Sequence, residues 1–273
     1  MAFEGCGFAF DGIPSSEFGL MIYDFGTNTQ GDSPIASTGE IISEQLGRKP
    51  RSYLYGVTQS KPLEFRLVFG VNRNSVHAHK PLDRWDIQSI TAWLTGHDDG
   101  KWKWLEVEQP DMETVRYKCL ISELTPISEG LETWAFSCKV TCDSPFGYTY
   151  PETFSYRLKG SSQEVMLYNR SSFHGDYYPR LELLLNGGDG ISIVNHHDGG
   201  REFCFFDLAP FMPLTLIVDN ENQVIKSDKL LPKSAYSYFN LNFFRLKRGD
   251  NSLVLNGQGV VKIICEFPVN VGG

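Results

Sequence analysis

Residues 8–22, Phe8-Ala9-Phe10-Asp11-Gly12-Ile13-Pro14-Ser15-Ser16-Glu17-Phe18-Gly19-Leu20-Met21-Ile22, decide which kind of fold the first half of this chain adopts. Phe8 and Phe10 alternate about a small residue, as in a strand with one buried face. Gly12-Ile13-Pro14-Ser15 predicts a turn, and the two-residue period resumes at Phe18. The pattern therefore predicts a strand pair that ties the N-terminal part of the chain into a sheet.

Length and composition predict a globular protein rich in strands. The chain has 273 residues, of which 41% are hydrophobic and 21% charged, enough for one large or two ordinary domains. Its 19 phenylalanines, 12 tyrosines and 26 glycines favour many strands joined by tight turns. Apolar runs are too short to span a bilayer, and the first residues lack the basic region and apolar core of a secretory signal. We therefore expect a soluble chain without a membrane span or a cleaved leader.

The charge balance bears on the class of partner. A net charge of −8 argues against specific nucleic-acid binding, which needs cations facing the phosphates. It is compatible with a wall along which nucleic acid slides, because an acidic surface repels the phosphate backbone.

The six cysteines predict free thiols rather than a disulfide framework or a metal site. They show no CxxC spacing. Cys138 and Cys142 lie in an alternating strand pattern and so about 13 Å apart along it. Disulfide-bonded Cα atoms lie within about 7 Å of each other. We therefore expect buried thiols, kept reduced in the cytoplasm where the chain is made.

One helix is predicted in the first half, with strands on both sides of it. Pro81-Leu82-Asp83 supplies its start, with Asp83 as the N-cap and Gly96 as the stop. Its apolar stripe consists of Ile87, Ile90 and Leu94, flanked by Trp85 and Trp93. We interpret both tryptophans as core residues rather than as a ligand platform. Alternation predicts half-buried strands at 63–69 and 133–142, and two shorter ones at 41–42 and 52–55.

A domain boundary is predicted at Asp143–Pro151, which contains two prolines and a glycine. The predicted domains are residues 1–145 and 146–273. The second has no convincing helix and about eight short strands, which favours a β-sandwich. The expected strands are 164–168, 180–185, 191–194, 202–207, 214–219, 238–244, 252–255 and 261–267, with turns at 186–190, 198–200, 219–222, 249–251 and 256–257.

No motif in the sequence predicts a catalytic residue, a cofactor or a metal site. The chain has no GxSxG elbow and no GxGxxG phosphate loop. His77 and His79, and likewise His196-His197-Asp198, are close in sequence, but their surroundings favour structural or exposed roles. Asp219–Gln223 resembles the start of a calcium loop but lacks its later glycine and glutamate, which favours a hairpin turn.

Several short motifs follow one another in an informative order. Those in the first half are Phe8-x-Phe10-x-Gly12, Ser15-Ser16, Phe18-Gly19-Leu20, Leu46-Gly47-Arg48, Leu63-Glu64-Phe65-Arg66-Leu67, and a helix from Arg84-Trp85-Asp86-Ile87 to Trp93-Leu94. Those in the second half are Tyr168-Asn169, Pro179-Arg180-Leu181-Glu182-Leu183, Asp219-Asn220-Glu221 and Leu246-x-x-Gly249-x-Asn251. Their order resembles the distal tail proteins (Dit) of long-tailed phages that infect Gram-positive bacteria. Arg170-Ser171-Ser172 departs from that family, in which a glycine often follows the asparagine.

This resemblance implies a structural virion protein without catalysis, the hub of the baseplate or tail tip at the distal end of the tail. Dit proteins form a six-fold ring whose N-terminal domains enclose a channel for DNA. Their galectin-like C-terminal domains, β-sandwiches similar to carbohydrate-binding modules, project outward. The implied partners are further copies of the chain, the major tail tube protein, the tail-tip or tail-associated lysin protein, and a receptor-binding protein or host saccharide.

The resemblance also implies a hairpin arm that reaches the neighbouring subunit. Its basic tip would be Arg48, Lys49 and Arg51, with Tyr53 and Tyr55 packing behind. The three cations also fit a solvated hairpin end, a common feature of acidic proteins.

Two other functions stay open from the residues. A lectin would stack saccharides on exposed aromatic residues, for which Tyr177-Tyr178, Tyr236 and Tyr238 are the candidates, since residues 144–273 contain no tryptophan. A glycosidase would need two carboxylates opposed across a cleft, and Glu106 and Glu108 instead share one face of a predicted strand. The glycosidase is the least supported of the three.

Overall fold

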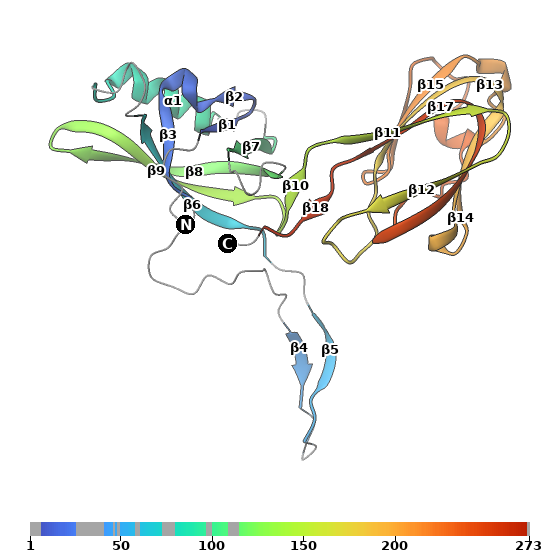
Figure 1. The fold of residues 1–273 in the computed structure, drawn as a ribbon, viewed down its shortest axis with the longest axis horizontal. Coiled ribbons are helices and arrows are strands. Elements are labelled where there is room, and N and C mark those ends of the chain that lie inside the picture. The colour runs from blue at the N-terminus through green and yellow to red at the C-terminus, as the bar shows by residue number, and fades with distance from the viewer. Residues whose placement is uncertain are drawn as a thin grey trace. The chain divides into compact units, whose positions relative to one another are not determined.

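The computed structural model describes residues 7–25, 41–45, 47, 50–57, 61–72, 80–96, 100–108 and 115–271. These residues form two compact units (Figure 1). The first ends at Tyr148, the second comprises Thr149–Val269, and the last two described residues, Asn270 and Val271, belong again to the first. Within the described ranges there is one α-helix and otherwise mostly strand, so the predicted mainly β class is confirmed.

The first unit is built on a sheet in the order β2-β1-β7-β8-β9-β6-β3. Its strands are β1 (Phe8–Phe10), β2 (Ile13–Pro14), β3 (Leu20–Phe25), β6 (Glu64–Val71), β7 (Lys103–Val107), β8 (Val115–Glu129) and β9 (Glu132–Cys142). Two short strands, β10 (Gly147–Thr149) and β18 (Pro268–Val269), lie where the chain passes between the units and pair with each other. The 3-10 helix η1 (Ser15–Phe18) and the helix α1 (Arg84–Thr95) accompany the sheet. A separate two-stranded hairpin is formed by β4 (Ile41–Glu44) and β5 (Tyr53–Val57).

The opening stretch forms the predicted strand pair, but its turn lies earlier than the sequence indicated. Asp11 and Gly12 make the turn, with φ angles of 52° and 78°. Ile13 therefore pairs back onto Phe10 in β2, and the predicted turn at residues 12–15 is wrong. Proline is tolerated in β2 because this strand is an edge of the sheet, where an amide donor is not needed.

Helix α1 begins as predicted. The Asp83 carboxylate accepts from the amides of Trp85 and Asp86, and the Asp86 carboxylate accepts from the Asp83 amide in return. Its buried residues, Ile90 and Leu94, join the core of the first unit.

The two tryptophans of α1 differ. The ring of Trp93 stacks on Phe18 and Phe8 at 4.6 and 5.6 Å, and its Nε1 donates to the Phe10 carbonyl. Trp85 is 76% exposed, so its predicted place in the core is wrong. At about 100° per residue, Trp85 lies about 140° around the helix from Ile90, whereas Trp93 lies about 60° from it.

The described cysteines are free, and four of the five are buried. Cys119 and Cys142 face each other on β8 and β9 in the core of the first unit. Burial raises the pKa of Cys138 and of Cys142 to about 12, which keeps both thiols neutral. The predicted buried thiols are confirmed for these four, Cys204 is partly exposed, and Cys6 lies outside the described residues.

The second unit is a seven-stranded sheet arrangement around its own core, in the order β11-β17-β13-β15-β16, with β12 beside β17 and β14 beside β13. Its strands are β11 (Glu152–Lys159), β12 (Gln163–Asn169), β13 (Arg180–Asn195), β14 (Arg201–Phe205), β15 (Leu214–Asp219), β16 (Val224–Ser227) and β17 (Gly249–Cys265). The 3-10 turns are η2 (His196–Asp198), η3 (Ala209–Phe211) and η4 (Ala235–Tyr238). As expected, the unit has no α-helix among its residues.

Two predicted turns lie inside long strands: residues 186–190 contain the bulged residues of β13, and Asn256-Gly257 is a paired part of β17. The strands expected at 180–185 and 191–194 are one strand, β13, and those expected at 252–255 and 261–267 belong to β17. The glycine-rich segment 186–190 and Asn256-Gly257 lie where the register of the β13–β17 ladder shifts. Glycine at these positions bends and twists two continuous strands instead of ending them.

The predicted strand at 238–244 is wrong, although its three phenylalanines are buried. Leu241 has a φ of 61°, which no strand accepts. Backbone pairing with β14 is limited to one bridge between Phe205 and Phe239. Beyond it, the Asn240 side chain accepts from the Cys204 amide and donates to the Glu202 carbonyl. The segment thereby delivers Phe239, Phe243 and Phe244 to the core as an irregular loop.

The buried side chain of Asn251 fixes the backbone of the residues that precede it, Lys247 to Gly249. Asn251 is fully buried, and its Oδ1 accepts from Asn195 Nδ2 and from the Lys247 amide, both at 2.9 Å. Its Nδ2 donates to the carbonyls of Lys247 and Gly249. One side chain thus satisfies the Asn195 amide group and three backbone groups of Lys247 and Gly249, at the start of β17.

We expect Asn251→Ala to destabilise the second unit by about 3 kcal/mol, because it removes several hydrogen bonds and leaves buried polar groups unpaired. Urea unfolding followed by tyrosine near-UV circular dichroism measures the loss. Asn186→Ala is the control, since Asn186 is exposed in β13 and its replacement should cost less than about 0.5 kcal/mol. Equal midpoints for the two variants would contradict this assignment.

Candidate assembly surfaces

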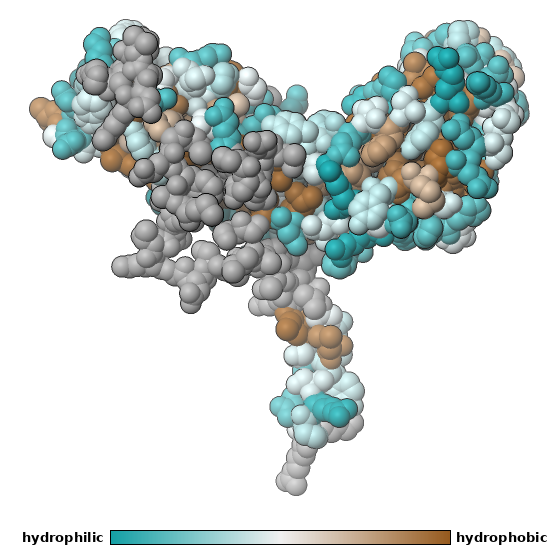
Figure 2. Space-filling model, viewed as in Figure 1, coloured by the Kyte–Doolittle hydropathy of each residue, from teal (hydrophilic) through white to brown (hydrophobic). Residues whose placement is uncertain are grey.

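The β4–β5 hairpin exposes large apolar side chains on both of its faces. Ile42 lies opposite Gly56, and Ser43 lies opposite Leu54, with a bulge between the two pairs. Side chains alternate between faces along a strand, so Ile41 and Leu54 share one face. Figure 2 shows apolar patches on this hairpin.

The second face of the hairpin carries tyrosines. Glu44 lies opposite Tyr53, and the Tyr55 hydroxyl donates to the Glu44 carboxylate at 3.3 Å. Tyr53, Tyr55 and Ile42 therefore lie on one face, and each is more than 40% exposed. An isolated two-stranded hairpin is marginal in water, and one with two apolar faces gains stability when another surface covers it.

The predicted arm residues fall only partly within the described chain. Arg48 and Lys49 lie outside it, and Arg51 is exposed before β5. Tyr53 and Tyr55 are exposed on the hairpin surface, where they form part of one face. The sequence reasoning missed the apolar contribution of Ile41, Ile42 and Leu54. The signal was the adjacent pair Ile41-Ile42, which puts one apolar side chain on each face.

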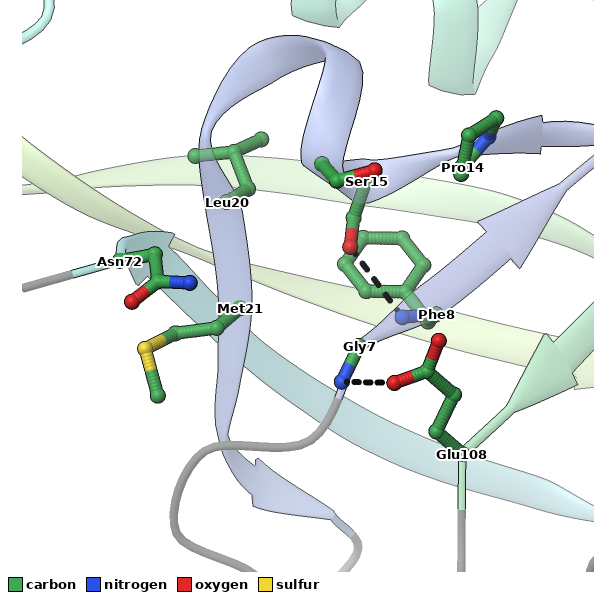
Figure 3. Close-up of a pocket in the computed structure, with 9 residues that line it drawn as sticks. Gly7, Phe8, Pro14, Ser15, Leu20, Met21, Asn72 and Glu108 are labelled. Atoms are coloured by element: carbon green, nitrogen blue, oxygen red, sulfur yellow. Dashed lines mark hydrogen bonds between the residues drawn. The ribbon is translucent and has the colours of Figure 1, made fainter. Parts of the chain in front are cut away.

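A cavity of about 170 Å³ lies beside the start of β1 (Figure 3). The Glu108 carboxylate accepts from the Gly7 amide at 3.1 Å, and the buried Ser15 hydroxyl accepts from the Phe8 amide. Both side chains therefore satisfy backbone amides at the start of β1. Glu106 lies on β7, directly opposite Arg116 on β8.

The histidine and aspartate candidates have structural surroundings. Among the residues that the structure places, there is no group of three potential metal ligands, and His77 and His79 are outside them. Asp198 in η2 accepts from Arg245 Nε at 2.6 Å and pairs with Lys247 at 3.0 Å. Burial opposes the charge of Asp198, but these bonds outweigh it and hold its pKa below the ordinary value.

Asp176 completes this group of charges. It pairs with Arg245 Nη1 and with Lys247 Nζ, both at 2.5 Å. Two cations and two carboxylates thus join three loops at one end of the second unit. Because Arg245 and Lys247 each pair with carboxylates from two other loops, the cluster holds the three loops together.

Three of the four tyrosines considered as saccharide platforms, all except Tyr178, have contacts within the fold. The Tyr177 hydroxyl accepts from the Glu266 amide at 2.7 Å, and its ring packs on Phe267. The Tyr236 hydroxyl donates to the Gln223 carbonyl at 2.8 Å. Tyr238 packs against Phe211. These contacts account for the three tyrosines without a ligand.

No helix in the described part of the chain is long and apolar enough to cross a membrane.

Three solved structures resemble this one along nearly the full chain. The crystal structure of the Dit protein of phage SPP1, presented as a paradigm of the hub adsorption apparatus in phages that infect Gram-positive bacteria, aligns with a TM-score of 0.61 at 12% identity, over 96% of this chain and 99% of that one. A chain of the phage P2 baseplate in its activated conformation with calcium aligns with a TM-score of 0.51 at 11% identity, over 95% and 97% of the two chains. The corresponding strontium structure gives 0.50 at 12% identity, over 95% and 98%. At such identities the likeness shows the fold, and the predicted resemblance to Dit proteins is confirmed at that level.

Sequence families give the assignment. No curated protein matches the chain. A family model described as a phage tail protein N-terminal domain matches residues 3–144, and one described as a phage tail C-terminal domain matches residues 146–265. The first match alone extends over more than half of the chain, and the chain therefore belongs to this family of phage tail proteins.

Proposed function

We propose that this phage tail protein is the distal tail hub, a hexameric ring that joins the tail tube to the tail-tip protein and leaves a channel for DNA. The observation that carries this proposal is the likeness to the SPP1 hub protein over 96% of this chain and 99% of that one. Two partial folds shared by chance would not extend over both chains end to end. The role is structural and needs no catalytic residue.

The β4–β5 hairpin supports the ring. Its two apolar faces fit an arm that a neighbouring subunit covers, and the covering surface differs from the arm itself. Contacts between two different patches are heterologous, and they close into a ring when the rotation between subunits divides a full turn. In this proposal residues 1–145 form the ring, and the β-sandwich of residues 146–273 projects from it.

The purified protein is expected to run as a species of six times the 30.8 kDa chain mass. Light scattering after size exclusion gives this mass, and negative-stain images of the same peak should show a six-fold ring with a central hole. Adding the tail tube protein and the tail-tip protein tests assembly if the chain alone is a monomer. A monomer that stays one with both partners would overturn the proposal.

A further inference from the structure

The β8–β9 hairpin ends in a turn that exposes an apolar side chain. Glu129 lies opposite Glu132, so Gly130 and Leu131 form a two-residue turn, in which Gly130 has a φ of 65°. Leu131 is 104% exposed, and Ile127 on β8 is 43% exposed. Figure 1 shows that this end of the hairpin extends beyond the neighbouring strands of the sheet. Both apolar side chains are therefore accessible to a partner.

Two glutamates share a face of this hairpin with Ile127. Side chains alternate along β8, so Ile127 and Glu129 point to the same side. The register puts Glu132 directly opposite Glu129 on that side. The hydroxyls of Ser128 and Thr133, 3.1 Å apart, lie on the other side. We call Ile127, Glu129, Leu131 and Glu132 the acidic tip.

The two glutamates of the acidic tip repel each other. Side chains directly opposite on antiparallel strands lie about 5 Å apart, and like charges there destabilise the pair. Residues 124–138 contain no lysine or arginine. Within the described chain neither Glu129 nor Glu132 forms an ion pair. A cation from outside the subunit would relieve this repulsion.

The start of α1 lies beside the acidic tip. Leu82 forms an isolated bridge with Thr133, and its amide donates to the Thr133 carbonyl at 2.8 Å. Trp85, which is 76% exposed, follows three residues later. Tryptophan is enriched among the residues that carry most of the binding energy of protein interfaces. The acidic tip and Trp85 together therefore have the composition of a protein docking surface, with apolar side chains and charges that select the partner.

The β4–β5 hairpin of another copy has the complementary composition. Its faces expose apolar and aromatic side chains, among them Leu54 at 66% and Tyr55 at 62%. The segment that joins its two strands contains Arg48, Lys49 and Arg51. Arg51 is exposed, and it has no ion pair within the described chain. Cations and apolar side chains on this hairpin thus match carboxylates and apolar side chains on the acidic tip.

We propose that the acidic tip, together with Trp85, is the surface on which the β4–β5 hairpin of the neighbouring copy docks. This inference rests on the proposed function and names the receiving side of the ring contact. The cations of the hairpin neutralise Glu129 and Glu132, while Leu131 and Trp85 cover one of its apolar faces. Because the two patches differ, the contact is heterologous, as a closed ring requires. Like charges also keep two hairpins, or two acidic tips, from docking on each other.

The first test exchanges the signs of the two sets of charges in the full chain, with the tail partners present if assembly needs them. Glu129→Lys/Glu132→Lys keeps a like-charge pair within the subunit but repels the arriving hairpin. The concentration at which half of the rings dissociate should rise at least about tenfold, measured by ultracentrifugation of a dilution series. Arg48→Glu/Lys49→Glu/Arg51→Glu should have the same effect. Combining both sets of changes should return the value to within about threefold of the parent, because the two sets are coupled.

The matched control makes the same change of net charge at two exposed positions of the second unit. Glu164→Lys/Glu221→Lys should leave the half-dissociation concentration within about threefold of the parent. The urea transition of the first unit, followed by tryptophan emission, should be the same in all variants and so exclude unfolding as the cause. Equal dissociation of the control, or no recovery in the combined variant, would overturn the proposal. Intact rings that bind the tail tube or tail-tip protein more weakly would assign the acidic tip to that partner instead.

The second test measures proximity between copies. Leu131→Cys and Leu54→Cys are placed in separate copies, in a background with Cys6→Ser/Cys204→Ser, and rings are assembled from an equal mixture. A short bismaleimide should join the two kinds of copy, whereas Met166→Cys on β12, in place of Leu131→Cys, should give no such product. Rings that form without the cross-link would overturn this inference and leave the proposed function standing. If the parent forms no ring with or without tail partners, the proposed function is wrong, and this inference with it.

Discussion

Gly259→Ala is expected to unfold the second unit at room temperature, with a loss of more than about 4 kcal/mol, a magnitude reached only by severe packing or backbone faults. Gly259 lies in β17 with a φ of 144°, where a residue with a side chain is strained. A Cβ there would lie 2.1 Å from the Leu184 carbonyl oxygen and 2.9 Å from the Leu185 Cα. Both atoms belong to the paired backbone of β13, so relief requires breaking the longest ladder of the unit.

Unfolding of the two units can be followed by different optical signals in this variant. All five tryptophans lie before residue 144, so tryptophan emission follows the first unit alone, whereas seven of the twelve tyrosines lie in the second unit. Gly259→Ala should therefore reduce the tyrosine near-UV circular dichroism strongly and keep the urea transition that tryptophan emission reports.

Gly188→Ala is the matched control, because Gly188 also has a positive φ, 79°, but its Cβ would meet nothing closer than 3.9 Å. It should cost only about 1–2 kcal/mol for the left-handed backbone. If both variants unfold to the same extent, close packing of β13 on β17 is not the cause.

Ile42→Ser/Tyr55→Ser is expected to convert the proposed ring to monomers. Both side chains lie on one face of the β4–β5 hairpin, and both are about half exposed or more in the single chain. Covering a large apolar side chain contributes about 1.5–3 kcal/mol, so each subunit contact would lose several kcal/mol, and the ring repeats that loss at every contact. Light scattering should then give the mass of one chain.

Two control variants show which face of the hairpin is covered and whether the effect is specific to the hairpin. Ile41→Ser/Leu54→Ser tests the other face in the same way and shows whether one or both faces are covered. Met166→Ser/Tyr168→Ser removes two side chains that are each 62% exposed on β12, and it should leave the ring intact. If both hairpin variants assembled like the parent, the arm would have no role in the ring.

The elements best predicted from the sequence are those fixed by near neighbours. The start of α1 follows from the reciprocal bonds of Asp83 and Asp86, which lie three residues apart. β15 occupies the predicted residues 214–219, and the turn after it is closed by Asp219, which accepts from Asn222. In these places the partners of each backbone group are a few residues away and therefore visible in the sequence.

Other elements depended on partners far along the chain. Residues 186–190 and 256–257 look like turns, but in the ladder between β13 and β17 the first segment is a bulge in β13 and the second is a paired part of β17. The predicted strand at 238–244 failed because its pairing with β14 ends after the bridge at Phe239, and the side chains of Asn240 and Asn220 then bond the backbone. Hydrogen bonds from side chains to the backbone leave no periodic pattern in the sequence, so the sequence could not predict them.

By itself, the sequence determined the mainly β class, the single helix, the buried thiols and the presence of a hairpin before β6, because alternation and capping are local. Only the tertiary structure decided which surfaces are available to partners. The hairpin has two apolar faces because of its register, and Lys139 on β9 is paired because it meets Glu64 on β6, 75 residues away in the chain. Exposure and charge pairing are properties of neighbours across strands, and these neighbours are fixed only when the sheet forms.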